Sequence, residues 1–386
     1  MSDRSTAAST TRNGAFDGLR GLAILLVVLS HGWTLWPTTG IDKSTVSLDL
    51  FSSGDFAVSI FFVVGAFLAT DSMLRHARRQ SKLHPWVTLL RRYLRLSGQV
   101  YFLLLVVMLV TVLDTSDLYP HTETRNGFLH VISYTWNWYL QGHALVARPD
   151  LGHLWYLSVD LQVFVLILFV VALLIRHPGW LVLSLAGILA AALAWRTHVY
   201  DTEGAYQALL RTTARMDAPI AGALAASLMP FVGRLRPLAP FVGLLSLVSL
   251  IPLAHLSRPV TGYFGWPGAA LDAALGLFMI SCSLAQPSRL VGVPLSFRPL
   301  TVLGRRSLGI YLWHYPVFWF VARHTSSWAW EWRTVLAFGI TVVTSVASEA
   351  IVESRVRRLL ASAAWHELET STPRFLTSRA KALVGR

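Results

Sequence analysis

Long apolar segments separated by short polar loops recur along the whole chain. A helix needs roughly twenty mostly apolar residues to cross a bilayer. Segments of that kind predict ten spans, at 16–36, 54–74, 96–114, 152–175, 179–197, 213–232, 237–256, 266–285, 303–323 and 331–352. The predicted fold is therefore all-α, with about ten transmembrane helices around a central cavity.

Two segments depart from this pattern. Residues 126–145 are aromatic and amphipathic, so we interpret them as an interfacial or re-entrant helix and not as a span. The segment 213–232 is the weakest predicted span, because it contains Arg215 and Asp217. These two residues lie two positions apart and face different directions on a helix, which favours separate partners on other helices over an ion pair between them.

The charges of the loops give the spans an orientation. Basic residues gather in the loops that are cytoplasmic if the N-terminus is inside, and acidic residues gather in the opposite loops. The basic set is Arg75, Arg78, Arg79, Lys82, Arg91, Arg92, Arg95, Arg176, Arg234, Arg236, Arg289, Arg298, Arg305, Arg306, Arg355, Arg357 and Arg358, and the acidic set is Asp42, Asp49, Asp114, Asp117, Glu123, Asp150, Asp201 and Glu203. The pattern predicts an inner-membrane protein with both termini in the cytoplasm.

The composition supports a membrane protein and excludes a large soluble domain. Hydrophobic residues make up 54% of the chain and charged residues 14%, with a mean hydropathy of +0.52, whereas soluble domains have about 25% charged residues. The net charge of +13 is explained by the loop bias, so we expect no nucleic-acid partner. We expect a disordered cytoplasmic segment at 1–13, a transmembrane domain at 14–358 and a basic cytoplasmic tail at 359–386.

Cysteine content and the N-terminus narrow the picture further. The single cysteine, Cys282, excludes an internal disulfide and a cysteine-based metal cluster. Its apolar neighbours indicate a small buried hydrophobic residue, and no metal site is predicted. Residues 1–13 are polar, and the apolar segment that follows is too long for the core of a signal peptide, so we expect it to be a retained span.

The first span carries an arginine and a histidine, Arg20 and His31. Their offset of eleven residues is about three helical turns, which places the side chains within about 20° of one another and about 16 Å apart along the axis. Ionisable groups inside a bilayer are costly and point to function. The alternatives are that Arg20 reaches toward cytoplasmic headgroups and that His31 lies at the membrane interface, beside Trp33 and Trp36.

The two residue types suit a long substrate with an anionic end and a reactive end. A neutral histidine in a cavity of low polarity can act as a general base. An arginine anchors phosphate or carboxylate groups. Acyl-coenzyme A has a shape that matches this pair.

Seven blocks of the sequence resemble, in order, the motifs of the acyltransferase 3 family, the bacterial inner-membrane O-acyltransferases. The blocks are FDGLRGLAILLVVLSHG, SGDFAVSIFFVVGAFLAT, LLRRYLRL, LGHLWYLSVDLQVFVL, RMDAPIAGALAA, GRRSLGIYLWHYPV and VESRVRR. The resemblance covers about residues 14–358. It implies an enzyme that acylates glycans, lipids or small molecules such as macrolides.

The resemblance also implies roles for single residues. His31 is expected to be the catalytic histidine and Arg20 its partner, while Asp160 orients His31 or a sugar hydroxyl. Three arginines before the third span are expected to bind the phosphates of coenzyme A: Arg91, Arg92 and Arg95. The positive-inside rule is the alternative explanation of the three arginines, and a helix N-terminal acid is the alternative for Asp160.

Four further residues are candidates for the substrate cavity: Arg215, Tyr311, His314 and Glu353. Tyr311 and His314 lie one turn apart and are equally typical of an aromatic belt at the membrane surface. Glu353 ends the last span, where it could pair with cytoplasmic arginines.

Three positions depart from the family pattern. The serine usual in the second span is replaced by Gly65, and Ser97 and Gly98 stand where a proline usually follows the arginines. Asp160 is followed by Leu161, where many members have a second acid. These changes bear on the substrate more than on the type of reaction.

The sequence thus predicts an O-acyltransferase with no permanently bound cofactor, which uses cytoplasmic acetyl-coenzyme A as co-substrate. The predicted acceptor is a hydroxyl of a cell-envelope glycan or lipid-linked sugar, reached directly or through a separate transferase on the outer side. A small acceptor such as a macrolide is the alternative within this class. The rivals outside it are a transporter or lipid flippase, for which no internal symmetry is visible, and a non-catalytic scaffold, which would gain nothing from a buried Arg20–His31 pair.

Overall fold

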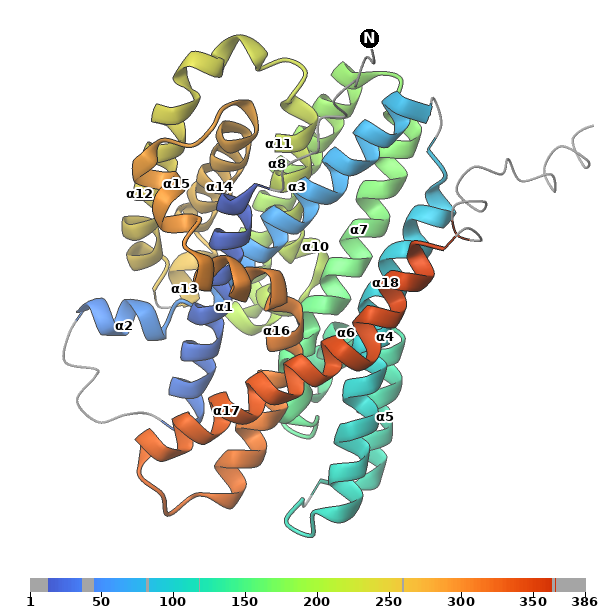
Figure 1. Ribbon diagram of the computed structural model, residues 1–386, viewed down its shortest axis with the longest axis vertical. Coiled ribbons are helices and arrows are strands. Elements are labelled where there is room, and N and C mark those ends of the chain that lie inside the picture. The colour runs from blue at the N-terminus through green and yellow to red at the C-terminus, as the bar shows by residue number, and fades with distance from the viewer. Residues whose placement is uncertain are drawn as a thin grey trace, which may run out of the picture. The chain divides into compact units, whose positions relative to one another are not determined.

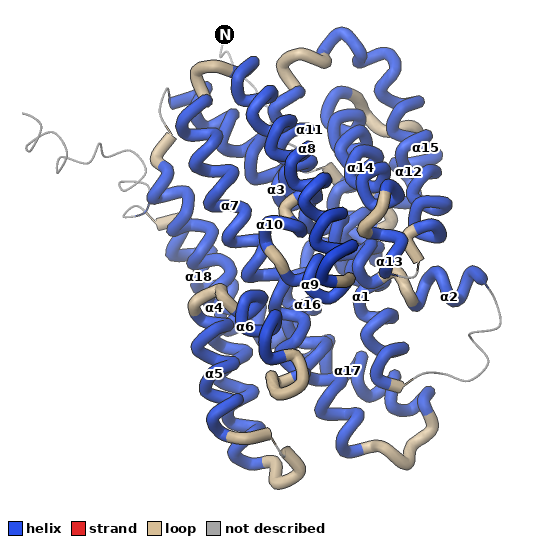
Figure 2. The backbone as a smooth tube through the Cα atoms, turned by 180° about the vertical axis from the view of Figure 1, so that it is seen from behind, coloured by secondary structure: helices blue, strands red, loops and turns tan. Residues whose placement is uncertain are grey.

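The computed structural model describes residues 13–36, 45–80, 83–117, 119–258, 260–362 and 365. All secondary-structure elements in these ranges are helical, which confirms the all-α prediction (Figures 1 and 2). The predicted disordered N-terminus lies outside the described residues except for Asn13, as does the predicted basic tail except for 359–362 and 365. The chain divides into two compact units that alternate along the sequence.

Unit 1 runs up to Ser72 and resumes from His177 to Tyr311. Its helices are α1 (Gly14–Leu35), α2 (Thr45–Phe51), most of α3 (Gly54–Gln80), α8 (Pro178–Glu203), α9 (Ala205–Leu210), α10 (Thr212–Arg215), α11 (Asp217–Leu228), η3 (Gly233–Leu238), α12 (Ala239–Leu256), α13 (Val260–Tyr263), α14 (Trp266–Leu284), α15 (Arg289–Leu295) and the first half of α16 (Arg298–His324). Its core is formed where α14 packs against α11 and α12, and α11 against α8.

Unit 2 comprises Met73–Arg176 and the chain from Leu312 onward. Its helices are α4 (Pro85–Leu113), α5 (His121–Ile132), α6 (Trp136–His143), η2 (Pro149–Leu154), α7 (Trp155–Leu174), the second half of α16, α17 (Trp330–Ser348), η4 (Glu349–Glu353) and α18 (Ser354–Leu360). Within this unit α4 packs against α5, α7, η4 and α18.

Proline and glycine mark where several helices begin and end. Pro85, Pro178 and Pro267 stand in the first turn of their helices, where the missing N–H breaks no helical hydrogen bond. Helix α8 ends at Gly204, whose φ of 88° is readily available only to glycine. These residues set the lengths of the apolar helices.

Eight segments of the described residues, and not ten, are long and apolar enough to cross a membrane. They are Gly14–Leu35, Gly54–Arg79, Pro85–Leu113, Pro149–Leu174, Pro178–Glu203, Gly233–Leu256, Trp266–Leu284 and Trp330–Leu360. The chain is therefore polytopic, and the predicted count of about ten is corrected.

The two predicted spans that fail do so for different reasons. Segment 213–232 breaks at Met216 into the four-residue α10 and the twelve-residue α11, and α11 is only about 18 Å long. Helix α16 has 27 residues, but arginines and a polar aromatic run (YLWHYP) make it too polar to count as a span. The region around 126–145 is not a span either, as predicted.

That region forms two short helices, α5 and α6, which fold back along α4 (Figure 1). They are joined at Tyr134, the one non-glycine residue with a positive φ, 54°, among those described. The Tyr134 hydroxyl lies 3.0 Å from that of Ser97. Ser97 is sixteen residues, or about 24 Å, from the end of α4. This position of the turn beside the middle of α4 favours the re-entrant alternative over the interfacial one, and we refer to α5–α6 as the re-entrant hairpin.

Candidate functional site

Helix α1 carries both Arg20 and His31 without a break. Its first turn is capped by Asn13, whose side-chain oxygen accepts a hydrogen bond from the Ala15 N–H at 3.0 Å. The same side chain donates to the Cys282 carbonyl at 2.9 Å. The start of α1 is thereby tied to α14, and Cys282 is buried, as predicted.

Three glycines bring α1 into backbone contact with the end of α15 and the first two turns of α16. A Cβ added at Gly304 would lie 1.7 Å from the carbonyl oxygen of Asp17, and one at Gly18 would lie 1.8 Å from that of Leu295. A Cβ at Gly21 would meet the Leu300 carbonyl at 2.1 Å. Only glycine fits at these positions, so they determine the depth and rotation of α1.

This close approach sets the position of Arg20. Its guanidinium donates a hydrogen bond to the Ser307 hydroxyl, one turn beyond Gly304 on α16, at 2.9 Å. Arg20 is therefore held by a neighbouring helix of the same unit. It is partly buried.

His31 is half-buried near the end of α1. Helix α3 runs antiparallel to α1, since the rings of Phe16 and Phe67 meet at 6.1 Å and Ser30 abuts Gly54. His31 therefore lies level with the first turn of α3. The structure confirms that Arg20 and His31 share one continuous helix; their catalytic roles stay predictions.

Arg215 and Asp217 belong to a buried ion cluster at the break between α10 and α11. Asp217 accepts a close hydrogen bond from Arg196 of α8, and its other oxygen lies 3.6 Å from the Arg215 guanidinium. All three side chains are at most 1% exposed. The ion pair that helical spacing disfavoured does form, because Met216 interrupts the helix, and Asp217 also has the expected partner on another helix.

Arg215 has further partners on α3 and α13. It donates to the hydroxyl of Tyr263 and to that of Ser59, at 2.9 Å. Its guanidinium also lies over the rings of Tyr263 and Phe62, at 4.5 and 5.3 Å from their centroids. The predicted cavity residue Arg215 is thus enclosed by protein groups.

In unit 2, Arg92 and Asp160, for which the sequence predicted different roles, form an ion pair. Arg92 of α4 donates to both carboxylate oxygens of Asp160 on α7, at 2.7 and 2.6 Å. The Arg92 guanidinium also stacks over Phe164 at 4.5 Å. The two charges neutralise each other, so each helps to hold the other in place.

The two neighbouring arginines face elsewhere. Arg91 and Arg95 lie one turn apart on α4 and are exposed, and Arg91 approaches the Trp365 ring at 5.8 Å. Glu353, at the end of η4, accepts a hydrogen bond from Gln99 of α4 at 3.0 Å. It also pairs with Arg357 at 3.2 Å, which is the contact with a basic residue that its position suggested.

Tyr311 and His314 are both buried on α16. The Tyr311 ring meets Phe61 in unit 1 at 6.4 Å, whereas His314 meets the His153 ring in unit 2 at 5.4 Å. A residue buried in protein does not belong to an exposed aromatic belt, so burial argues against that alternative.

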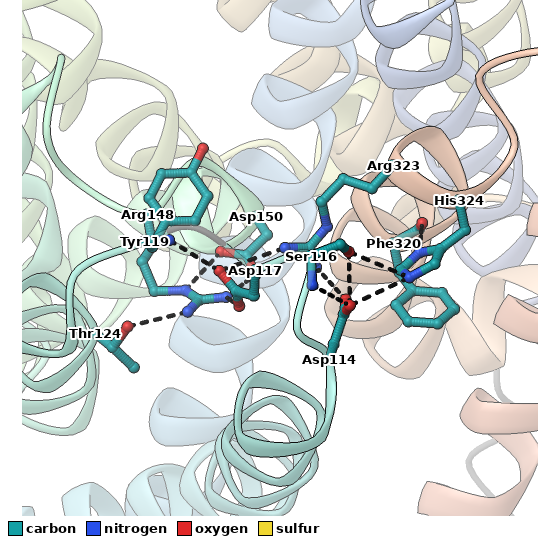
Figure 3. A network of polar contacts seen from close by, with 10 residues as sticks. All are labelled: Asp114, Ser116, Asp117, Tyr119, Thr124, Arg148, Asp150, Phe320, Arg323 and His324. Carbon is teal, nitrogen blue, oxygen red and sulfur yellow. Dashed lines mark hydrogen bonds and ion pairs between the residues drawn. The ribbon is translucent and has the colours of Figure 1, made fainter.

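A second polar network lies in unit 2 near the end of α4, and nothing in the sequence connects its members (Figure 3). Arg148 is 1% exposed and bridges Asp117 at 2.9 Å and Asp150 at 2.6 Å. Arg323, near the end of α16, reaches Asp117 at 3.4 Å and Asp114 at 3.5 Å. The network ties α16 to the α4–α5 turn.

Hydrogen bonds and nearby cations control the acids of this network. Burial alone would raise the pKa of Asp117, but the charge and hydrogen bonds of Arg148 and the Tyr119 N–H bring it below its usual value. Burial acts in the same direction on Asp114, but hydrogen bonds from Ser116 and the nearby cations together more than offset it, so the pKa of Asp114 is also lowered. Both acids are therefore ionised at neutral pH.

The sequence did not single out Arg196 and Tyr263 of this cluster, nor Asp272, which is buried on α14 of the same unit. Arg196 and Asp272 fall inside the predicted spans 179–197 and 266–285. The rule that marked Arg20 and His31, an ionisable group within an apolar span, applies to them equally. Tyr263 carries no such signal.

The fold and these buried charges define a polytopic membrane protein with ionisable groups inside its helical units. Comparison with known proteins then gives the family. The model of an acyltransferase domain matches residues 13–350, so the chain belongs to the acyltransferase 3 family.

Curated relatives are similar over most of this chain. Peptidoglycan O-acetyltransferase OatA of Listeria monocytogenes is 25% identical over 92% of this chain and 57% of its own length. O-acetyltransferase OatA of Staphylococcus aureus is 24% identical over 79% of this chain and 50% of its own length. The chain thus spans about half the length of these relatives. No solved structure matches it.

Proposed function

We propose that this protein is a membrane O-acetyltransferase that takes an acetyl group from cytoplasmic acetyl-coenzyme A and passes it to a hydroxyl of a cell-envelope glycan or glycolipid. The observation that carries the proposal is the family match, which covers residues 13–350 and so includes every candidate residue except Glu353. Both relatives are named O-acetyltransferases, which supports the acetyl group, and the Listeria protein is named for peptidoglycan, which supports a glycan acceptor.

In the proposed reaction the acceptor oxygen attacks the thioester carbonyl, a C–O bond forms and the C–S bond breaks. One proton moves in net terms from the acceptor hydroxyl to the departing thiolate. His31 either takes the hydroxyl proton as a general base or carries the acyl group briefly on its ring. Arg20, held by Ser307, acts beside it on the same helix.

The structure changes the proposed roles of the other candidates. Arg91 and Arg95 are exposed, so they are the arginines proposed to meet the coenzyme phosphates. Arg92 holds Asp160, so we assign both to positioning within unit 2. Arg215, Tyr311, His314 and Glu353 stay proposed residues of the substrate cavity.

The revised count keeps the proposed side of the termini but not of every loop. Eight spans, like ten, leave both termini on the same side of the membrane, and the basic residues at the ends of the second and the last span support the cytoplasm as that side. With eight spans, however, the arginines of η3 and those between Trp266–Leu284 and Trp330–Leu360 fall on the opposite side, against the positive-inside rule. Residues 14–358 are proposed as one transmembrane acyltransferase domain, with a basic tail after it. A separate outer transferase would complete the transfer if the glycan lies beyond the reach of the domain.

The test is acyl transfer from labelled acetyl-coenzyme A by the purified protein in detergent. His31→Ala is expected to lose transfer by about two orders of magnitude or more, the usual contribution of a general base. His198→Ala, at an exposed histidine of α8, is the matched control and should keep full activity. Undiminished transfer by His31→Ala would overturn both routes, and a trapped acyl-histidine would select the second.

The acceptor is tested in cells. Mass spectrometry of envelope glycans should show fewer O-acetyl groups when His31→Ala replaces the native protein. An unchanged glycan profile, together with active purified enzyme, would reject the glycan and point to a small-molecule acceptor.

A further inference from the structure

Unit 1 buries an acid, Asp272, that the proposed reaction does not use. Asp272 lies on α14 and is 2% exposed. Neither of its carboxylate oxygens has a hydrogen-bond partner among the described residues. An ionised carboxylate is strongly disfavoured in such a place, because the hydrogen bonds of water are lost and not replaced.

The group that faces Asp272 is a second acid, Asp217. Asp217 opens α11, which packs against α14: Gly276, one turn after Asp272, lies close to Ala225 of α11. Gly268, one turn before Asp272, lies close to the Arg196 guanidinium that binds Asp217, which places the two acids at the same level of the packed helices. One oxygen of Asp217 is bound by Arg196, and the other has no hydrogen bond within the described part of the chain. A carboxyl proton between the two acids would provide the missing donor.

The charges around the pair also favour one proton bound between the two acids. Two guanidinium groups lie against Asp217, that of Arg196 from α8 and that of Arg215 from α10, and the Tyr263 hydroxyl on α13 accepts a hydrogen bond from Arg215. The carboxyl group of Asp55 on α3 interacts with Arg215. The two cations therefore meet three acids, and one bound proton makes the cluster neutral.

The other helices packed on α14 add no charge to the cluster. On α12 the titratable residue is His255, which is exposed and pairs with Asp49 at 3.0 Å. The arginines of η3, Arg234 and Arg236, are exposed. The proton balance is therefore set by the residues of α3, α8, α10, α11, α13 and α14.

We propose that Asp217 and Asp272 share one proton and form a buried proton-binding site in unit 1. The proton resides on Asp272 and is donated to the Asp217 oxygen that Arg196 leaves open. Two carboxyl groups placed side by side in this way do not both ionise, as the paired acids of aspartic proteases illustrate.

The role of the site rests on the proposed function. Acyl transfer from a thioester to a hydroxyl moves one proton to the departing thiolate, and His31 in the same unit gains and loses charge during that transfer. A site that already holds a proton can release it or take it back as the charge nearby changes. Such a site keeps the total charge of the apolar unit constant through the reaction.

Infrared spectroscopy tests the proton without reference to catalysis. The purified protein should show a carbonyl band of a protonated carboxylic acid that shifts in heavy water and disappears in Asp272→Asn. Asp201→Asn, at an exposed acid of α8, is the control and should leave the band in place. A band unchanged in Asp272→Asn would overturn the proposal, as would the absence of any such band, which would assign the open oxygens to bound water.

Unequal effects on stability give a second test. Asparagine at 272 still offers an N–H to Asp217, so Asp272→Asn should melt at nearly the native temperature. Asp217→Asn leaves two buried arginines without their shared carboxylate and should melt several degrees lower, or fail to fold. Equal destabilisation of the two variants, or a greater destabilisation of Asp272→Asn, would refute a proton held on Asp272.

The role is tested separately by the pH profile of acyl transfer. Asp272→Asn cannot exchange a proton, so its profile should be displaced from the native one while the protein stays folded. An unchanged profile would reject the role and leave the proton site in place. If the infrared band disappears in Asp272→Asn but the native protein transfers no acyl group, the site is retained and the proposed function is rejected.

Discussion

Gly304→Ala tests whether the packing of α1 against α16 holds the proposed catalytic helix in place. The new Cβ would lie 1.7 Å from the Asp17 carbonyl oxygen, half the 3.4 Å at which ordinary van der Waals contact begins. The obstacle is backbone, so no side-chain rotation relieves it and α1 must move away. Overpacking of this kind costs about 1–3 kcal/mol, and weaker dispersion attraction along a displaced α1 adds to that cost. We expect the free energy of unfolding to fall by about 3 kcal/mol or more.

The matched control is Gly339→Ala. Gly339 is exposed within α17, and a Cβ there meets nothing within 4 Å. Replacing glycine by alanine inside a helix should stabilise it by up to about 1 kcal/mol. Thermal unfolding in detergent, followed by tryptophan fluorescence, should show Gly304→Ala melting several degrees lower and Gly339→Ala unchanged or slightly higher.

Acyl transfer should separate the two variants further. A shift of α1 moves Arg20 away from Ser307, so Gly304→Ala should lose activity even at temperatures where it is folded. Equal melting temperatures for Gly304→Ala and Gly339→Ala would refute the close packing inferred for α1. Full activity in a destabilised Gly304→Ala would refute the link between that packing and the site.

Four other substitutions probe the second span, the Arg92–Asp160 pair and the unit 2 network. A Cβ at Gly65 meets nothing within 4 Å, so Gly65→Ser should fold normally, and any change in acyl transfer then reports a polar role for the serine usual in the family. Arg92→Ala and Asp160→Ala should each cost about 2 kcal/mol in unfolding experiments, with the double variant well short of the sum; additive effects would contradict the pair. The depressed pKa of Asp117 stabilises the protein fully above about pH 4 and progressively less as the pH falls through its folded pKa. Asp117→Asn should therefore make the melting temperature fall less steeply as the pH is lowered. An unaltered fall would contradict the stabilisation assigned to ionised Asp117.

Apolar length was enough to predict an all-helical membrane fold and most of its spans. The wrong predictions concern segments that are long enough to span a membrane but also contain charged residues. The segment 213–232 has the composition of a weak span, yet Arg215 and Asp217 find partners on other helices, and the chain breaks at Met216 to reach them. Sequence shows that such charges are present, but it does not show whether a helix bends to pair them.

The candidate site was predictable as a set of residues and not as a set of contacts. Spacing along one helix was enough to relate Arg20 to His31. Nothing in the sequence linked Arg92 to Asp160, because 67 residues separate them and each had a separate role by resemblance. The acid pair of Asp217 and Asp272 was not predicted for the same reason, since the partner of a buried charge depends on packing between helices.

The re-entrant hairpin has a consequence for how the protein is made. Helix α5 contains Glu123, Arg125 and two histidines, and charged residues of this kind are rejected when a nascent segment is offered to the bilayer alone. We therefore expect the α5–α6 pair to pack only after α4 and α7 have been inserted, when Ser97 and Gln162 can bind the polar atoms of Tyr134. A nascent chain halted before α7 should then have this hairpin still unpacked.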